Sequence, residues 1–385
     1  MPFSGSTFTN VNGATTAVPG QIIQSAVWNN IHSDYATAFN QLMGQLIGVQ
    51  SNRNILWMNG GLEIWQRGAG ASASIVVGST STAYTADRWY ITTGANQSHT
   101  IAAIAGLSNR SQLAARIRRD AAQVGVTAMV FGHPLDTDEL FRLRGNKVAL
   151  SALLSAGVNW SPTNGTLVVS LYVGTGAVGK RGGGFAGETQ VITISTNLTP
   201  GGAAVAISGQ SSGTVPTNAT QGELQFSWTP VGAAGAADDF TIDDIELESI
   251  TSSLTWVPFI YDRLDFSTML LGCKRHYTKT HPYEVNPTYG AGLANSLSFL
   301  SQATARISLF WQLTQEMRAN PSFTKYHPTT ATSSNWFDFT GGVSVLASID
   351  ITNNSNATKG ILIYGATAAA IDRFIYIHMA ADAGI

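Results

Sequence analysis

Short strand-like runs alternate with glycine-rich turns through most of this sequence, between residues 54 and 253. The runs occupy residues 148–154, 166–173, 189–195, 224–228 and 240–247. Turn residues separate them, for example Asn164-Gly165 and Pro200-Gly201-Gly202. Short strands joined by such turns are typical of all-β sandwiches. We therefore predict a β-sandwich over this region.

The last of these runs changes phase in its middle. Phe240 and Ile242 share one face of an extended strand, whereas Ile245 and Leu247 share a face one residue out of phase. An extra residue between Ile242 and Ile245 would bring both pairs to the same face of the sheet. The sequence therefore predicts a β-bulge at this point.

The composition limits the classes of partner. Charged residues make up only 11% of the chain, and the formal net charge is −2. Nucleic acids and anionic membranes are bound through basic surfaces, so we expect neither as the main partner. Hydrophobic residues reach 44%, which favours a folded chain over a disordered one. Cys273 is the single cysteine and rules out an intrachain disulfide framework.

Residues 21–47 carry a different pattern. Apolar residues recur there at steps of three and four, which predicts one long amphipathic helix. The stripe consists of Val27, Ile31, Tyr35, Ala38, Leu42 and Leu46. Such a helix either packs on its own domain or joins other copies in a short coiled coil. Little neighbouring sequence is left to cover the stripe, so we favour an oligomer and expect a homotrimer.

Two blocks between residues 58 and 90 concentrate arginine, aspartate and large rings. The first alternates apolar and polar residues over 62–69, which predicts a strand entered through a glycine turn. The second, 83–91, is rich in aromatic residues and predicts another strand. We assign a structural role to Trp65, Gln66, Arg67, Asp87, Arg88 and Trp89. Asp87 is expected to pair with Arg67 or Arg88, because a buried guanidinium group needs a counter-charge.

These blocks resemble a known signature. The Asn-Gly…Trp-Gln-Arg-Gly block at 59–68 and the Tyr-Thr-Ala-Asp-Arg-Trp block at 84–89 resemble tail-fibre and receptor-binding (host attachment) proteins of tailed phages and phage-like gene transfer particles. In that family the signature opens a jelly-roll domain similar to carbohydrate-binding modules. Residues 143–151 and 242–248 resemble later parts of the same domain. The resemblance implies a virion-attachment segment at 1–53, a jelly-roll β-sandwich at 54–255 and a C-terminal tip domain at 256–385.

The C-terminal region also resembles that family, in segments 270–277, 317–323 and 375–383. Ser267 is expected to cap a short helix that continues through Tyr277. The chain then returns to strand-like patterns. We therefore predict a mainly β protein: an N-terminal helix, the jelly-roll β-sandwich, and a C-terminal β-sandwich that forms the distal tip.

Residues 280–340 combine aromatic and histidine side chains with glycine, serine and asparagine. Aromatic faces beside adaptable polar groups suit saccharide rings. The predicted ligand-binding residues are Tyr283, Tyr289, Tyr326, His327 and Trp336. The alternative is that these rings line the axis of the trimer.

Two further patterns suggest ligands. Asp238, Asp239 and Asp243 could hold a structural calcium ion, since hard oxygen ligands at a loop–strand junction suit calcium. The alternative, which we favour, is a solvated strand face. Residues 174–180 have the spacing of a phosphate-binding loop. Arg181 follows where a serine or threonine would hold magnesium, so we predict an ordinary β-loop instead.

The resemblance implies a structural virion protein, a tail fibre, tail tip or head spike subunit that attaches the particle to host surface glycans. Its partners would be other virion proteins, reached through the N-terminus, and it would lie on the tail or capsid surface after assembly in the host cytoplasm. No nucleophile–base pair or opposed carboxylates appear, so we expect no catalytic residues. The alternative is a phage depolymerase that cleaves or de-esterifies glycans. The sequence has no uninterrupted apolar run of about 18 residues, so we expect no membrane insertion.

Overall fold

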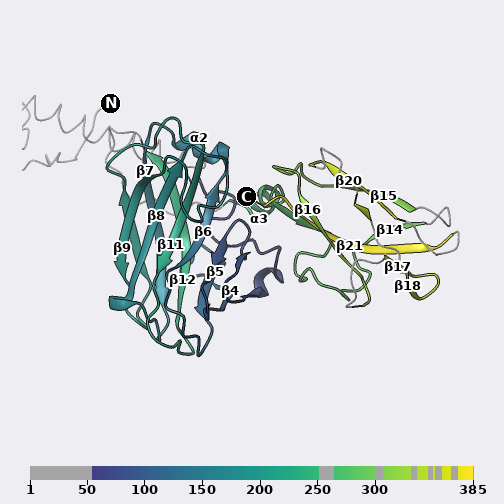
Figure 1. The fold of residues 1–385 in the computed structure, drawn as a ribbon, viewed down its shortest axis with the longest axis horizontal. Coiled ribbons are helices and arrows are strands. Elements are labelled where there is room, and N and C mark those ends of the chain that lie inside the picture. The colour runs from purple at the N-terminus through teal and green to yellow at the C-terminus, as the bar shows by residue number, and fades with distance from the viewer. Residues whose placement is uncertain are drawn as a thin grey trace, which may run out of the picture. The chain divides into compact units, whose positions relative to one another are not determined.

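The computed structural model describes residues 54–250, 264–300, 307–330, 336–345, 350–351, 358–365 and 372–384 (Figure 1). All of them belong to one compact unit, residues 54–385. The amphipathic helix expected at 21–47, and the attachment segment that contains it, lie outside the described residues. In the described part of the chain, no helix has the length and apolar character needed to cross a membrane.

Residues 54–250 form two six-stranded antiparallel sheets. The first sheet has the order β1 (Ser74–Val77), β4 (His99–Ala105), β5 (Leu113–Arg119), β12 (Asp239–Ile250), β7 (Lys147–Ala156), β10 (Val205–Gln210). The second has the order β2 (Thr82–Tyr84), β3 (Tyr90–Thr92), β6 (Met129–Leu135), β11 (Gln221–Trp228), β8 (Thr166–Gly174), β9 (Thr189–Asn197). Between strands lie α2 (Thr137–Leu143) and two short 3-10 turns, η1 (Gly70–Ser72) and η2 (Thr163–Gly165).

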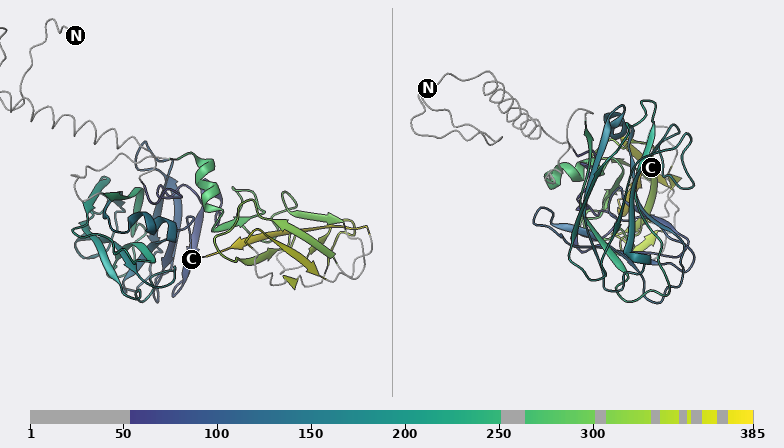
Figure 2. Two further views of the ribbon diagram at one scale, coloured as in Figure 1. Left: turned by 90° about the horizontal axis from the view of Figure 1, so that it is seen from above. Right: turned by 90° about the vertical axis from the view of Figure 1, so that its left-hand side faces the viewer.

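The apolar core fills the space between the two sheets, as alternation along the strands requires. On β11, Leu224 and Phe226 point into this core and are fully buried. Trp89 stacks on Phe131 there, with ring centroids 5.1 Å apart and planes inclined by 9°. The predicted β-sandwich is therefore confirmed. Figures 1 and 2 show its two layers of strands.

The five strand-like runs predicted from the sequence correspond to β7, β8, β9, β11 and β12. The predicted bulge is also confirmed, because the pairing of β12 with β7 shifts register between Asp243 and Glu246. Ile242, Ile245 and Leu247 are all buried as a result.

The strand predicted at 62–69 is wrong. This segment consists of turns and irregular backbone, and Leu62 has a φ of 56°, in the left-handed region and far from the values of a regular strand. Its apolar–polar alternation does not separate an inner from an outer face, since Glu63 and Gln66 are as buried as Ile64. The second predicted strand, 83–91, is a tight hairpin of β2 and β3 instead, with Arg88 at a φ of 70° in the turn.

The C-terminal region begins with α3 (Phe266–Cys273). Asp265, and not Ser267, caps this helix: its side chain accepts a hydrogen bond from the Thr268 N–H. The helix ends at Cys273, and Tyr277 opens a strand. The predicted helix is therefore present, but its cap and its end are corrected.

Two antiparallel sheets follow. Their strands are β13 (Tyr277–Lys279), β14 (Leu297–Leu300), β15 (Ile307–Gln312), β16 (Ser322–Tyr326), β17 (Trp336–Asp338), β18 (Val343–Val345), β19 (Asp350–Ile351), β20 (Gly360–Gly365) and β21 (Phe374–Asp382). β21 is the central strand, paired with β13, β14, β16 and β17. β15, β20 and β19 form a separate sheet; Figure 1 labels β21, β15 and β20. Trp311 of one sheet and Ile375 of the other share one apolar core, as expected for a C-terminal β-sandwich.

Candidate functional site

The outer face of the second sheet carries an unusual set of side chains. Because Leu224 and Phe226 point inward, their neighbours Glu223 and Gln225 point outward. Register places Tyr172 opposite Glu223, and Tyr84 opposite Tyr90. We call Tyr84, Tyr90, Tyr172, Glu223 and Gln225 the tyrosine face.

Gly132 on β6 sets the position of the Tyr90 ring. A Cβ atom at Gly132 would lie 2.6 Å from Glu223 Oε1 and 2.9 Å from Tyr90 Cε1. Because glycine has no Cβ atom, the Tyr90 ring can lie against β6. The Tyr90 hydroxyl then donates a hydrogen bond of 2.6 Å to Glu223 Oε1. Burial and the Glu223 carboxylate both raise the pKa of Tyr90, so the hydroxyl keeps its proton.

Glu223 is the buried polar centre of the tyrosine face. Its carboxylate accepts hydrogen bonds from the Tyr90 hydroxyl, from Gln225 Nε2 at 2.7 Å and from the Arg181 main-chain N–H at 2.7 Å. Burial raises the pKa of Glu223, although these donors act in the opposite direction. The carboxylate is therefore rigidly held by three donors.

A glycine-rich loop, residues 175–188, folds back over the tyrosine face. The Arg181 guanidinium group lies 3.8 Å from the centroid of the Tyr172 ring, and it donates to both oxygens of Glu188, at 2.8 and 2.7 Å. Lys180 Nζ lies 4.2 Å from the Tyr84 centroid and 5.1 Å from that of Tyr90. The loop leads into β9 and not into a helix, so the prediction of a β-loop is confirmed.

Solvent reaches only part of the tyrosine face: Tyr90, Glu223 and Gln225 are buried, whereas Tyr84 and Tyr172 are half-buried. At its β9 side, the exposed Gln190 donates to Ser170 Oγ at 3.1 Å and to the Tyr172 hydroxyl at 3.3 Å. Hydrolysis of a glycoside needs two carboxylates across the scissile bond. In the described residues, Glu188 is the loop carboxylate at this face, and Arg181 engages both of its oxygens. Donors of the protein itself therefore engage both carboxylates, Glu188 and Glu223.

The sequence analysis missed the tyrosine face, although one signal was available. In the run 166–173, Leu167, Val169 and Leu171 alternate as inward residues, which turns Tyr172 outward. Tyr84 and Tyr90 gave no comparable signal, because β2 and β3 have three residues each and their pairing depends on a turn.

The ligand-binding residues predicted from the sequence lie in different surroundings. Trp336 is fully buried in the C-terminal core, and His327 is buried with its Nδ1 accepting from the Thr330 N–H. The Tyr283 hydroxyl is bound to main-chain atoms of the first sequence block, at Glu63 and Trp65. These three side chains therefore have packing or structural contacts.

Only Tyr289 and Tyr326 of that predicted set come together. Their ring centroids lie 5.3 Å apart, and Tyr289 is 37% exposed. His281, whose ring is 5.2 Å from Tyr326 and 4.1 Å from His378, completes this cluster.

The first half of the predicted structural motif connects the jelly roll to the C-terminal strands. Arg67 Nη2 lies 2.8 Å from Asp382, and Arg67 Nη1 lies 3.8 Å from Asp87. The Gln66 amide donates to Asp87 and, at 2.9 Å, to the Tyr277 carbonyl oxygen. The predicted pairing of Asp87 with one of the two arginines is confirmed for Arg67. Burial raises the pKa of Asp87 to about 6, against the effect of Arg67.

The second half of the motif has a partner that the sequence did not suggest. Arg88 is buried and donates to both oxygens of Glu139, at 2.6 and 2.9 Å, and to the Pro134 carbonyl oxygen at 2.9 Å. Trp89 lies in the sandwich core, and Trp65 is equally buried. The six motif residues thus have the contacts expected of a structural element.

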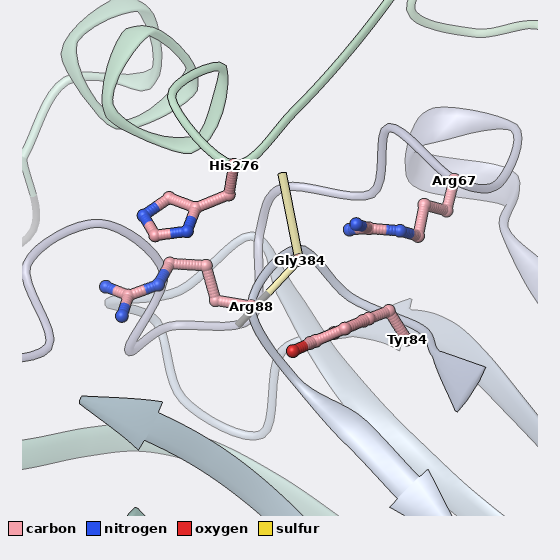
Figure 3. Close-up of a pocket in the computed structure, with 5 residues that line it drawn as sticks. All are labelled: Arg67, Tyr84, Arg88, His276 and Gly384. Carbon is pink, nitrogen blue, oxygen red and sulfur yellow. The ribbon is translucent and has the colours of Figure 1, made fainter. Parts of the chain in front are cut away.

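Figure 3 shows a cavity beside this motif, lined by Arg67, Tyr84, Arg88, His276 and Gly384. Its volume of about 10 Å³ leaves room for a single water molecule at most. We therefore do not regard it as a ligand site.

The three aspartates considered for calcium do not converge, and the solvated strand face favoured for them is wrong, because all three are buried. Asp238 accepts from Arg119 Nε at 2.8 Å, whereas the Asp243 carboxylate accepts from the Leu107 N–H at 2.7 Å. Asp239 lies near Arg116 and Arg118 instead. Over the described ranges, no group of three His, Cys, Asp or Glu side chains could hold a metal ion.

Comparisons with known proteins give only distant likenesses. No family model matches the sequence, and no curated protein matches it. Solved structures with a similar arrangement include a tailspike protein 4 domain of bacteriophage CBA120, at 13% identity and a TM-score of 0.28, over 51% of this chain and 22% of that chain. A xylan-binding domain of carbohydrate-binding module family 22 aligns at 13% identity and a TM-score of 0.29, over 44% of this chain and 90% of its own. A putative sugar-binding protein of Bacteroides thetaiotaomicron aligns at 13% identity and a TM-score of 0.30, over 45% of this chain and 92% of its own. At such TM-scores these likenesses support no further conclusion.

Proposed function

We propose that this chain is a glycan-binding protein and that saccharides bind on the tyrosine face of its jelly roll. One observation carries the proposal: the half-buried rings of Tyr84 and Tyr172 lie on an outward sheet face, and the exposed amide of Gln190 lies beside Tyr172. Sugar rings stack their C–H faces on aromatic rings, while their hydroxyl groups exchange hydrogen bonds with side chains such as the exposed Gln190.

The wider role that we propose is attachment of a virion to host surface glycans, as a tail fibre, tail tip or head spike subunit. The two sequence blocks that resemble phage attachment proteins support this role. A homotrimer joined through residues 21–47 would present three tyrosine faces, so weak single contacts would add through avidity. Electron micrographs of particles labelled with antibody against this chain would test the location.

A depolymerase is the second candidate, since Glu223 has a raised pKa, as a general acid requires. The tethering of Glu188 by Arg181 speaks against it, because the second carboxylate of a glycosidase must be available to a water molecule or the substrate. The enzyme would be favoured if the wild-type chain released reducing ends from a bound glycan and the Glu223→Gln variant did not.

The binding site is tested with Tyr172→Ala in the full chain, measured on a glycan array and by calorimetry with a glycan from it. Tyr289→Ala is the control, a change at an exposed tyrosine of the C-terminal region. We expect Tyr172→Ala to weaken binding about tenfold or more, since one aromatic stacking contact contributes on the order of 1–2 kcal/mol. Binding that survives Tyr172→Ala unchanged would overturn the assignment to this face.

A further inference from the structure

Lys180 places a cation on the tyrosine face. Its ammonium group lies over two rings, 4.2 Å from the Tyr84 centroid and 5.1 Å from the Tyr90 centroid. Aromatic rings attract cations through the negative potential of their faces, and groups of rings are the usual binding sites for ammonium ligands. The two tyrosines therefore form a cation site, which the chain's own lysine occupies.

Lys180 is held much less firmly than its neighbour Arg181. Arg181 is bound to Glu188 through two hydrogen bonds, stacks on Tyr172 and donates its main-chain N–H to Glu223. Among the described residues, no hydrogen bond or ion pair engages the Lys180 ammonium group, only the two rings. Its occupancy of the site is therefore exchangeable.

The loop around Lys180 allows such an exchange. Gly179 precedes it, and a Cβ atom there would meet only the Ala177 carbonyl oxygen, at 3.9 Å. A glycine on the side of Lys180 away from Arg181 lets the backbone there adopt new angles at little cost. The Lys180 side chain can thus leave the rings while Arg181 keeps its contacts.

Charges of both signs act on the site. The pKa of Lys180 lies below its ordinary value because burial lowers it, and the carboxylates of Asp382 and Glu223 offset only part of that effect. Arg67 has the opposite effect, and its own charge is balanced by Asp382 and Asp87. An external cation on the rings would meet the same two carboxylates.

We propose that Lys180 is a placeholder for an ammonium group of the ligand, and that the glycan bound here carries free amines, as in oligosaccharides of glucosamine. This inference rests on the proposed glycan binding by the same face. A sugar amine would take the place of the lysine ammonium on Tyr84 and Tyr90, while the sugar ring extends along the Arg181–Tyr172 stack toward Gln190.

The experiment compares a glucosamine hexasaccharide with its fully N-acetylated counterpart, which has the same backbone without the charges. Both are titrated into the full chain and into Lys180→Met, at mildly acidic pH where the ligand amines are protonated. Lys147→Met, a change on the other sheet, is the control. Circular dichroism checks that each variant is folded.

We expect the wild-type chain to bind the glucosamine hexamer about fivefold more tightly than the acetylated one, and Lys180→Met to widen this preference about tenfold by removing the competing cation. Lys147→Met should behave as wild type. Equal affinities for the two hexamers, or weaker binding of the glucosamine hexamer by Lys180→Met, would overturn the inference. Failure of both hexamers to bind would also overturn it. The proposed function would then be tested separately, by asking whether Tyr172→Ala weakens the binding of other glycans.

Discussion

Two regions of this molecule concentrate aromatic rings, and they use them differently. The tyrosine face arranges Tyr84, Tyr90 and Tyr172 on one outward sheet surface, around a carboxylate with three hydrogen-bond donors. In the C-terminal region Trp336 turns inward and the Tyr283 hydroxyl binds the main chain, whereas Tyr289 is exposed. The difference shows that aromatic content alone does not locate a binding surface, since the direction of each ring decides its use.

The largest expected effect is that of Trp336→Ala. The ring is fully buried in the C-terminal core and lies edge-on to Phe299, with centroids 4.9 Å apart. Its removal leaves a large cavity, so we expect the free energy of unfolding to fall by about 3–5 kcal/mol, measured by denaturant titration. Unchanged stability together with lost glycan binding would restore this residue to the binding site predicted from the sequence.

The next effect concerns the motif between the two regions. Asp87→Ala removes one of two carboxylates near Arg67 and the acceptor of the Gln66 amide. We expect a loss of about 2–4 kcal/mol in the free energy of unfolding, because a buried guanidinium group loses part of its counter-charge.

Asp87→Asn is the control for this change, since it keeps an acceptor for Gln66 and should cost less. Folded Asp87→Ala protein should bind glycans as wild type does. Normal stability with lost binding would show that the motif contacts the ligand.

The fold was predictable where strands are long and their residues alternate between inward apolar and outward positions. β7, β8 and β12 carry clear patterns, and the bulge followed from the phases of Ile242 and Ile245. The strand prediction failed at 62–69 because this irregular segment is buried on all sides, so its polar and apolar side chains are equally inaccessible. Only the contacts of the segment distinguish it from a strand.

The candidate site was less accessible to sequence reasoning. Tyr90 and Glu223 are 133 residues apart in the chain, and their hydrogen bond depends on the pairing of β3, β6 and β11. Arg88 likewise reaches Glu139 through a helix that the sequence did not reveal. Such contacts are set by topology, which local patterns do not encode.

A smaller effect concerns the pH response of the C-terminal ring cluster. The rings of His281 and His378 are stacked 4.1 Å apart, and burial lowers the pKa of His281 to about 4. Burial also lowers the pKa of His378, and the nearby Lys279 further disfavours a charge on His281. The unfolded chain, with ordinary histidines, therefore binds more protons than the folded chain between about pH 4 and 6.5.

Stability should accordingly fall as the pH falls through that window, by up to about 1.4 kcal/mol per pH unit for each histidine. Carboxyl groups with raised pKa values, such as Asp87, act in the opposite direction, so the test compares variants. His281→Gln should show a smaller loss of stability than wild type between neutral pH and about pH 4.5 in denaturant titrations. Equal slopes for the two proteins would exclude His281 as a contributor.

The smallest expected effect is the one that separates the two regions most directly. Tyr289 is 37% exposed and contacts Tyr326 through ring packing alone in the described part of the chain. A partly exposed side chain with one ring neighbour adds little to stability, so Tyr289→Ala should change the free energy of unfolding by about 0.5 kcal/mol or less. Glycan affinity should also stay within about twofold of wild type, because a change in affinity requires the ring to touch the ligand. Calorimetry with the glycan that responds to Tyr172→Ala provides the measurement. If Tyr289→Ala instead abolished binding while Tyr172→Ala did not, recognition would belong to the C-terminal rings, and the tyrosine face would be a polar surface that the glycine-rich loop keeps covered.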